Sequence, residues 1–141
     1  MIPVLDASVF VAAVSPTEAH HEAARRLYES HPRDCAYDVP SLFRLEVLAA
    51  LARRGEPDEL LDAVDALVRG PRFHVRPVDA ALLEHAAAVV RTARLRAYDA
   101  VYAALALEQD AALFTLDDDL ARRLALAYPQ ARVVTAPPVA P

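Results

Sequence analysis

The segment Val4-Leu5-Asp6-Ala7-Ser8 joins a short apolar run to an amphipathic stretch near the start of the chain. The apolar run at 2–5 predicts a strand, with Pro3 in its first turn, and a helix is expected from Ser8 to about Val14. Open parallel sheets carry their sites outside the carboxyl ends of the strands, which is where Asp6 would stand. An acid before a helix is equally typical of an N-cap, so Asp6 alone supports both interpretations.

Short β-like runs alternate with amphipathic stretches along the rest of the chain, which predicts a parallel sheet covered by helices. We expect strands at 2–5, 35–39, 73–78, 112–115 and 132–135, and helices at 8–14, 17–29, 41–54, 57–68, 80–93, 98–109 and 120–127. A chain of 141 residues predicts a single domain, here 1–135, followed by a proline-rich C-terminal tail at 136–141.

Composition excludes several classes of site. The chain has no lysine and only two glycines, so it contains neither a P-loop nor a dinucleotide fingerprint. Its single cysteine, Cys35, rules out an internal disulfide and a Cys-rich zinc site and fits a reducing compartment. No apolar run reaches the length of a membrane span, and the N-terminus lacks the basic start of a signal peptide. We therefore expect a cytoplasmic protein that does not enter membranes.

Glu46 has the most unusual surroundings of the acidic residues. Its neighbours one helical turn away are Leu42, Phe43, Ala49 and Ala50, all apolar. Most glutamates lie on a solvated helix face, but a carboxylate that emerges from an apolar surface needs a partner.

Asp99 and Asp117 occupy positions with both a structural and a functional interpretation. Asp99 falls in the first turn of the predicted helix 98–109, where an acid favours the helix dipole. That helix is apolar almost all round, so its first turn should meet the sheet rather than open water. Asp117 follows the strand 112–115, and the next residues are Asp118 and Asp119. Asp118 is best explained as a solvated first-turn acid, whereas Asp119 could reach the site as a secondary ligand.

Asp6, Glu46, Asp99 and Asp117 together predict a metal site. Carboxylates that share one site raise each other's pKa, and a divalent cation is the usual counter-charge. Oxygen ligands favour Mg²⁺, with Mn²⁺ as a second candidate. Ser8 and Thr115, each two residues from one of these acids, could bond a carboxylate or a metal-bound water.

Motifs around these acids resemble the PIN-domain nucleases, in particular the VapC-type toxins of bacterial toxin–antitoxin pairs. They are Leu-Asp-Ala-Ser-Val at 5–9, Glu-Val at 46–47, Tyr-Asp-Ala-Val-Tyr at 98–102 and Phe-Thr-Leu-Asp at 114–117. The resemblance implies a five-stranded parallel sheet in order 3-2-1-4-5 with helices on both faces. It implies that the four acids bind magnesium and cleave RNA, leaving a 5′ phosphate. It also implies homodimers and inhibition by a small antitoxin.

The arginines close in sequence to the acids are candidate phosphate contacts. They are Arg44, Arg94 and Arg96, and the alternative for each is a solvated charge. The resembling family often has a glycine just before the Asp99 motif, where this chain has the segment 94–97. The loop there is therefore expected to differ in shape.

We interpret the chain as a metal-dependent endoribonuclease. The alternatives are a PIN-fold module that binds nucleic acid or protein without cleavage, and a nuclease that cuts DNA. A receiver-like phosphatase using Asp6 is disfavoured because a receiver needs a lysine. Apolar side chains beyond one face of the helix 80–93 also favour a two-fold homodimer.

Overall fold

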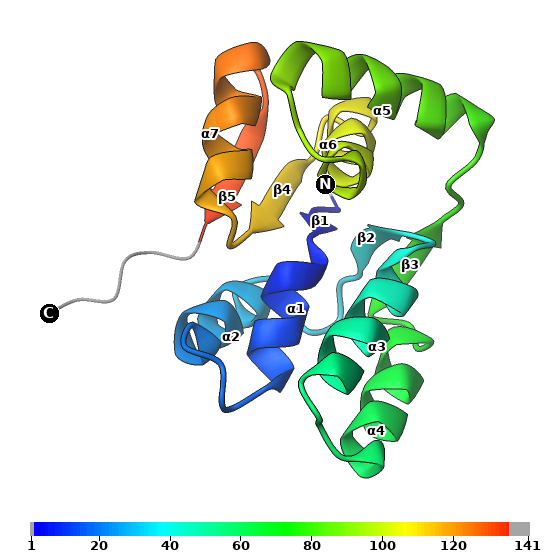
Figure 1. The fold of residues 1–141 in the computed structure, drawn as a ribbon, viewed down its shortest axis with the longest axis vertical. Helices are drawn as coiled ribbons and strands as arrows, with labels where there is room; N and C mark the ends of the chain where they lie inside the picture. The colour runs from blue at the N-terminus through cyan, green and yellow to red at the C-terminus, as the bar shows by residue number, and fades with distance from the viewer. Residues whose placement is uncertain (1, 136–141) are drawn as a thin grey trace, which may run out of the picture.

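The computed structural model describes residues 2–135 and contains one parallel sheet. Its five strands, in the order β3-β2-β1-β4-β5, confirm the predicted topology (Figure 1). The strands are β1 (Val4–Leu5), β2 (Tyr37–Pro40), β3 (Phe73–Arg76), β4 (Ala112–Thr115) and β5 (Arg132–Thr135). In the register of the sheet, Val4 stands opposite both Asp38 and Leu113. The expected C-terminal tail, 136–141, lies outside the described residues.

Helices cover both faces of the sheet. They are α1 (Ala7–Val14), α2 (His21–Glu29), α3 (Phe43–Arg53), α4 (Asp58–Val68), α5 (Ala80–Ala93), α6 (Ala97–Glu108) and α7 (Asp118–Ala127). The helix α6 packs on β1, β2 and β4 and contacts α5, which also contacts α7. On the other face α1 packs against α2 and α3. None of the helices in the described part of the chain is long and apolar enough to cross a membrane.

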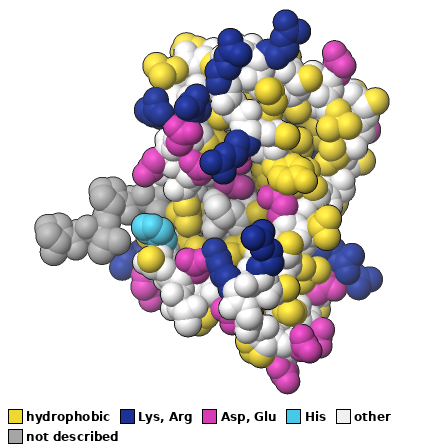
Figure 2. All heavy atoms as spheres, viewed as in Figure 1, with side chains coloured by type: hydrophobic (Ala, Val, Ile, Leu, Met, Phe, Trp, Pro, Cys, Tyr) yellow, Lys and Arg dark blue, Asp and Glu magenta, His cyan; other side chains and the backbone are white. Residues whose placement is uncertain are grey.

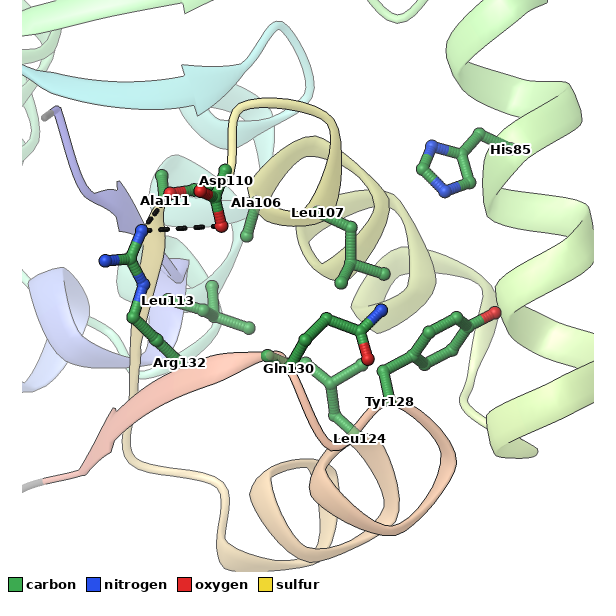
Figure 3. A pocket seen from close by; sticks show the side chains of 11 residues that line it. His85, Ala106, Leu107, Asp110, Ala111, Leu113, Leu124, Tyr128, Gln130 and Arg132 are labelled. Atoms are coloured by element: carbon green, nitrogen blue, oxygen red, sulfur yellow. Dashed lines mark hydrogen bonds and ion pairs between the residues drawn. The ribbon is translucent and has the colours of Figure 1, made fainter.

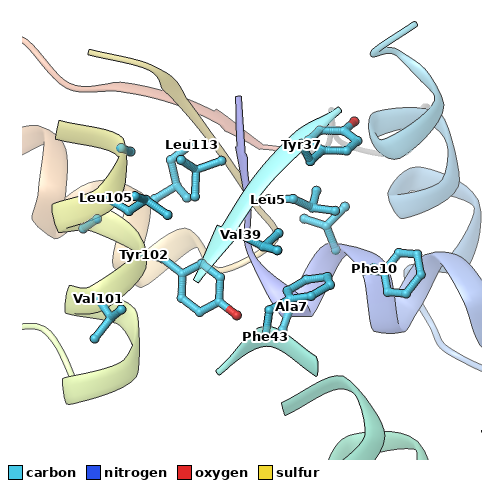
Figure 4. Close-up of a cluster of buried hydrophobic side chains, with 14 of the residues drawn as sticks. Leu5, Ala7, Phe10, Tyr37, Val39, Phe43, Val101, Tyr102, Leu105 and Leu113 are labelled. Carbon is cyan, nitrogen blue, oxygen red and sulfur yellow. The ribbon is translucent and has the colours of Figure 1, made fainter. Parts of the chain in front are cut away.

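The core lies on both sides of the central strands (Figure 4). On one side α6 is buried along most of its length, from Ala100 to Ala106, as its apolar sequence predicts. On the other side the ring of Phe10 in α1 contacts Phe73 edge-on, with centroids 5.1 Å apart. Tyr37 of β2 stacks on Tyr28 of α2 at 5.5 Å. This packing fixes the carboxyl ends of β1 and β4 relative to α3 and α6.

Two segments begin later than the sequence predicts. The second helix begins at His21 rather than Thr17, because the connection after α1 is held by side chains: buried Ser15 donates to Glu56 Oε1 at 2.8 Å. The second strand begins at Tyr37 rather than Cys35, because the Arg72 guanidinium donates to the backbone carbonyls of Pro32 and Cys35 and holds that segment in a loop.

Several smaller boundaries also differ, and α7 begins at Asp118 rather than Leu120 because Asp117 is its N-cap. The first strand is reduced to Val4–Leu5, since Pro3 has no N–H to donate and only its carbonyl joins the sheet, accepting from Asp38 N at 2.9 Å. The third helix begins at Phe43 rather than Ser41, whose backbone N–H donates to Arg76 O and whose hydroxyl accepts from Val78 N. These bonds tie Ser41 to the end of β3, and β3 itself ends at Arg76.

Candidate active site

Asp6 is buried at the carboxyl end of β1 and has two hydroxyl donors. The Thr115 hydroxyl donates to Asp6 Oδ2 at 2.7 Å and the Ser8 hydroxyl donates to the same oxygen at 2.8 Å. Asp6 occupies the N-cap position of α1, but its side chain makes no capping bond. Burial raises the pKa of Asp6, while the two hydroxyl bonds oppose the rise. The Asp6 carboxylate is therefore oriented toward the carboxyl ends of the strands and does not cap α1.

Glu46 projects from α3 toward the same edge. Burial, followed by the charges of Asp6 and Asp99, raises its pKa to about 7. The Tyr102 hydroxyl lies near enough to oppose this rise, but the two groups are not in hydrogen-bonding geometry. Within residues 2–135, Glu46 Oε1 and the Tyr102 hydroxyl are the buried side-chain polar atoms without a hydrogen-bond partner. An unpartnered buried carboxylate oxygen is costly unless a ligand completes it.

Asp99 stands in the first turn of α6, half-buried beside the other acids. Burial raises the pKa of Asp99 to about 6, and the charges of Asp6 and Asp117 add to the rise. The guanidinium of Arg96 opposes it. Asp99 therefore shares one electrostatic environment with acids that lie far away in the sequence.

The three consecutive aspartates after β4 differ in their hydrogen-bond partners and in their exposure. Asp117 is the N-cap of α7, and its Oδ1 accepts from Leu120 N at 3.0 Å. Its backbone N–H donates to the Thr115 hydroxyl at 3.1 Å. Asp118 is exposed in the first turn, as expected. Asp119 is also exposed and is bonded by Arg123 at 2.8 Å and by Arg122, and these bonds lower its pKa.

The four predicted acids thus come together at the carboxyl end of the sheet. Their charges contribute to one another's pKa shifts, as described for Asp6, Glu46 and Asp99. In the part of the chain that the structure describes, no three His, Cys, Asp or Glu side chains already stand in the arrangement of a bound ion. The donor set itself fits a hard divalent cation, because it consists of carboxylate oxygens and includes the unpartnered Glu46 Oε1.

The three candidate phosphate-binding arginines are placed differently. Arg44 pairs with Asp65 of α4, its Nε lying 2.6 Å from Oδ1. Arg94 and Arg96 instead line a cavity of about 260 Å³ together with Asp99 and Asp117. Arg94 has a left-handed backbone with φ of 59° at the C-cap of α5, a conformation that favours glycine.

A second cavity, of about 350 Å³, adjoins the acids on the other side and is also lined by Asp117. Figure 2 looks onto this face of the molecule: acidic side chains gather near its centre, with basic side chains, all arginine in this lysine-free chain, above and below them. The acids therefore lie between two cavities, on a surface that otherwise carries both charged and apolar side chains.

A third cavity, of about 230 Å³, lies at the opposite edge of the sheet (Figure 3). It is bounded by the carboxyl ends of α6 and α7 and by His85 of α5, and none of the four predicted acids lines it. Leu107, Leu124 and Tyr128 form much of its wall. Because it shares no lining residue with the four acids, it is no part of the candidate site.

Sequence reasoning did not identify Tyr102, Glu18, His20, Arg54 or Arg123 as residues of this region. Tyr102 lies one helical turn after Asp99 in α6, a spacing that places both on one face and could have indicated it. Glu18 and His20 come from the connection before α2, Arg54 from the C-cap of α3 and Arg123 from the middle of α7, and the sequence contains no periodic signal for where these meet the acids.

This geometry defines a class of protein: an α/β fold with an acidic site at the carboxyl end of a parallel sheet. The chain belongs to the PIN domain family, whose model matches residues 4–125. No curated protein sequence matches the chain.

Solved structures share the fold. Mycobacterium tuberculosis VapC20, described as a sarcin-ricin loop cleaving toxin, has a TM-score of 0.71 and 23% identity over 84% of this chain and 92% of that one. A toxin–antitoxin complex from Klebsiella pneumoniae has a TM-score of 0.71 and 17% identity over 96% of this chain and 98% of that one. VapBC2 from Rickettsia felis, bound to a DNA fragment from its promoter, has a TM-score of 0.69 and 15% identity with the same coverage.

Proposed function

We propose that the chain is a metal-dependent endoribonuclease and the toxin of a VapBC-type toxin–antitoxin pair. The observation that carries the proposal is the group of mutually coupled carboxylates, in which Glu46 and Asp99 have pKa values raised to about 7 and about 6. Perturbed acids gathered beside cavities mark functional sites more often than structural ones. The PIN family membership and the VapC neighbours support the same activity.

Asp6, Asp99 and Asp117 would hold Mg²⁺ or Mn²⁺, with Glu46 as a further ligand or as the group that orients the attacking water. A bound magnesium ion supplies a water of lowered pKa and offsets charge on the phosphate. Ser8 and Thr115 fix the Asp6 carboxylate by their 2.8 Å and 2.7 Å bonds. Asp119, held by Arg123, stands at the rim as a secondary group.

The substrate would be RNA, with Arg94 and Arg96 as phosphate contacts because they share a cavity with Asp99 and Asp117. Arg44 is less suited to this role, since its guanidinium is engaged by Asp65. A non-cleaving module is the second candidate; it accounts for the fold but gives no role to the raised pKa values of Glu46 and Asp99.

The proposed partners are a small antitoxin and a second copy of the chain, acting in the cytoplasm. Two of the solved structures with a similar fold are toxin–antitoxin complexes. Leu83 of α5 and Tyr98 of α6 are 51% and 64% exposed, which leaves apolar surface for a two-fold interface. A purified chain that light scattering finds monomeric at micromolar concentration would exclude the homodimer and leave the nuclease proposal intact.

The nuclease proposal is tested by Asp99→Asn, which keeps side-chain size and removes one charge. We expect RNA cleavage in magnesium to be lost, the wild type to be inactive in excess EDTA, and the variant to stay folded, because a repelling carboxylate has gone. Asp62→Asn, an exposed acid on α4, is the matched control and should cleave normally. Cleavage that persists in EDTA or in Asp99→Asn contradicts the metal mechanism.

A further inference from the structure

The 350 Å³ cavity beside the acids has an apolar floor and a polar rim. Its floor is made of aliphatic side chains from α1, α3 and the segment after β4: Ala7, Val11, Ala12, Ala50 and Leu116. Its rim carries Glu18, His20 and Arg54, and Glu46 and Asp117 close the side nearest the acids. A group bound here therefore lies next to the proposed cleavage site.

The rim is held in place from two directions. Glu18 and Arg54 form an ion pair that joins the α1–α2 connection to the C-cap of α3. The same connection is fixed by Ser15, which bonds Glu56 at 2.8 Å, and by His21, whose Nδ1 lies 2.8 Å from Ala12 O. The donor and acceptor groups at the rim are thus positioned before any ligand binds, which lowers the cost of binding.

The ion pair retains capacity for a ligand. It joins Nη2 of Arg54 to Oε1 of Glu18. A guanidinium has five N–H donors and a carboxylate two acceptor oxygens, so each group can bond a second partner. The pair therefore offers adjacent donors and acceptors above an apolar surface, and His20 adds an aromatic ring at the rim.

These features match a splayed-out nucleobase, which proteins hold against aromatic or apolar side chains and read by hydrogen bonds along its edges. Guanine presents two neighbouring N–H donors, at N1 and N2, to a carboxylate and two acceptors, O6 and N7, to a guanidinium. Pockets for small ligands start near 300 Å³, so the cavity has room for a single base.

We propose that this cavity, which we call the Glu18–Arg54 pocket, binds one unpaired guanine next to the phosphate that is cleaved. The inference rests on the proposed ribonuclease function and adds to it a determinant of sequence preference. Glu18 accepts from the N1 and N2 donors, Arg54 donates to O6 or N7, and Ala50 contributes part of the surface on which the base lies.

The test measures binding without cleavage, in EDTA, by fluorescence anisotropy. The probes are two labelled seven-nucleotide RNAs, one all uridine and one with a single central guanosine. We expect the wild type to bind the guanosine RNA at least about fivefold more tightly, the scale of one bidentate base contact. Arg54→Gln, which removes the positive charge and the forked donors of the guanidinium, and Ala50→Leu, which fills the floor, should abolish the difference.

Matched controls lie one residue away on the same helix. Arg53→Gln and Ala49→Leu repeat the same chemical changes at exposed positions that do not line the pocket, and both should keep the preference for guanosine. Circular dichroism checks that each variant is folded. Glu18→Gln, which removes the carboxylate charge, should also reduce the preference for guanosine.

Two results would overturn the proposed guanine site. One is equal affinity of the wild type for the two RNAs, and the other is a preference for guanosine that survives both Arg54→Gln and Ala50→Leu. The second result is also expected if the cavity serves a protein partner instead. A wild type that cleaves RNA in magnesium but shows either result leaves the proposed function standing, whereas a chain that neither binds nor cleaves RNA overturns both.

Discussion

The Thr115 hydroxyl donates a 2.7 Å hydrogen bond to the Asp6 carboxylate across 109 residues of sequence. The same hydroxyl accepts from the backbone N–H of Asp117 at 3.1 Å. One side chain of β4 thereby sets the positions of two acids, one after β1 and one after β4.

Replacement of Thr115 by Val should weaken both the fold and the site. The change leaves Asp117 N and one lone pair of buried Asp6 without their partner, which costs about 1–3 kcal/mol of unfolding free energy. Loss of the donor also raises the pKa of Asp6 further, so magnesium affinity at pH 7 should fall. Urea unfolding and calorimetric titration with Mg²⁺ measure the two effects. Thr92→Val, at an exposed position of α5, should change neither.

The metal-free protein should become less stable as pH rises from about 5 to about 7.5. The pKa values of Glu46 and Asp99, about 7 and about 6 in the folded protein, lie above those of unfolded Glu and Asp. The folded state then binds more protons than the unfolded state in this window, so unfolding free energy decreases with pH. The stabilisation is complete below the unfolded pKa values and is lost above the folded ones.

Thermal unfolding in EDTA at several pH values measures this dependence. Glu46→Gln cannot ionise, so its melting temperature should fall less steeply with pH than that of the wild type. Identical slopes for the two proteins would mean that Glu46 ionises normally.

Magnesium should raise the melting temperature, and by more at pH 8 than at pH 6. Binding to the folded state alone stabilises by about 2.7 kcal/mol at one hundred times the dissociation constant. Protonated Glu46 and Asp99 compete with the ion, so its affinity increases as they ionise. Asp99→Asn should reduce the shift, and Asp62→Asn should not. An equal shift at both pH values would show that these two acids do not hold the ion.

Arg72 should be the surface-loop residue to which stability is most sensitive. Its guanidinium lies 5.1 Å from the Tyr28 ring centre and 4.8 Å from that of Tyr37, and it donates to loop carbonyls including His31 O at 3.0 Å. Arg72→Ala should cost about 2–4 kcal/mol in urea unfolding. Arg72→Lys should recover little, since an ammonium lacks the planar fork. Arg69→Ala, 67% exposed with one contact at 3.9 Å, should cost under about 0.5 kcal/mol.

The alternation of strands and helices was predictable because each element carries its own periodicity, and the order of strands came from the resemblance to a known family. The proximity of the four acids followed from the same topology, since the carboxyl ends of parallel strands share an edge. Glu46 was indicated by its apolar neighbours as well as by the family motif, and its raised pKa has the cause that those neighbours suggest, namely burial.

What could not be predicted depends on side chains that reach between loops. Arg44 is two residues from Glu46, yet positions i and i+2 of a helix face different directions, and Arg44 pairs with Asp65 instead. The partners Glu18 and Arg54 meet only because the α1–α2 connection folds against the end of α3. No local pattern in the sequence encodes that meeting.

The backbone of Asp6 belongs to the sheet, because its N–H donates to Phe114 O at 2.9 Å. Asp6 is therefore a fixed anchor that cannot shift without breaking the central ladder. Asp117 is similarly tied as a helix cap, whereas Glu46 and Asp99 reach the site from separate helices on either side of it. With the backbone fixed in this way, adjustment around a bound ion falls to the side chains of Glu46 and Asp99. Each of them also lines one of the two cavities beside the acids, so ion binding and the shape of those cavities depend on the same side chains.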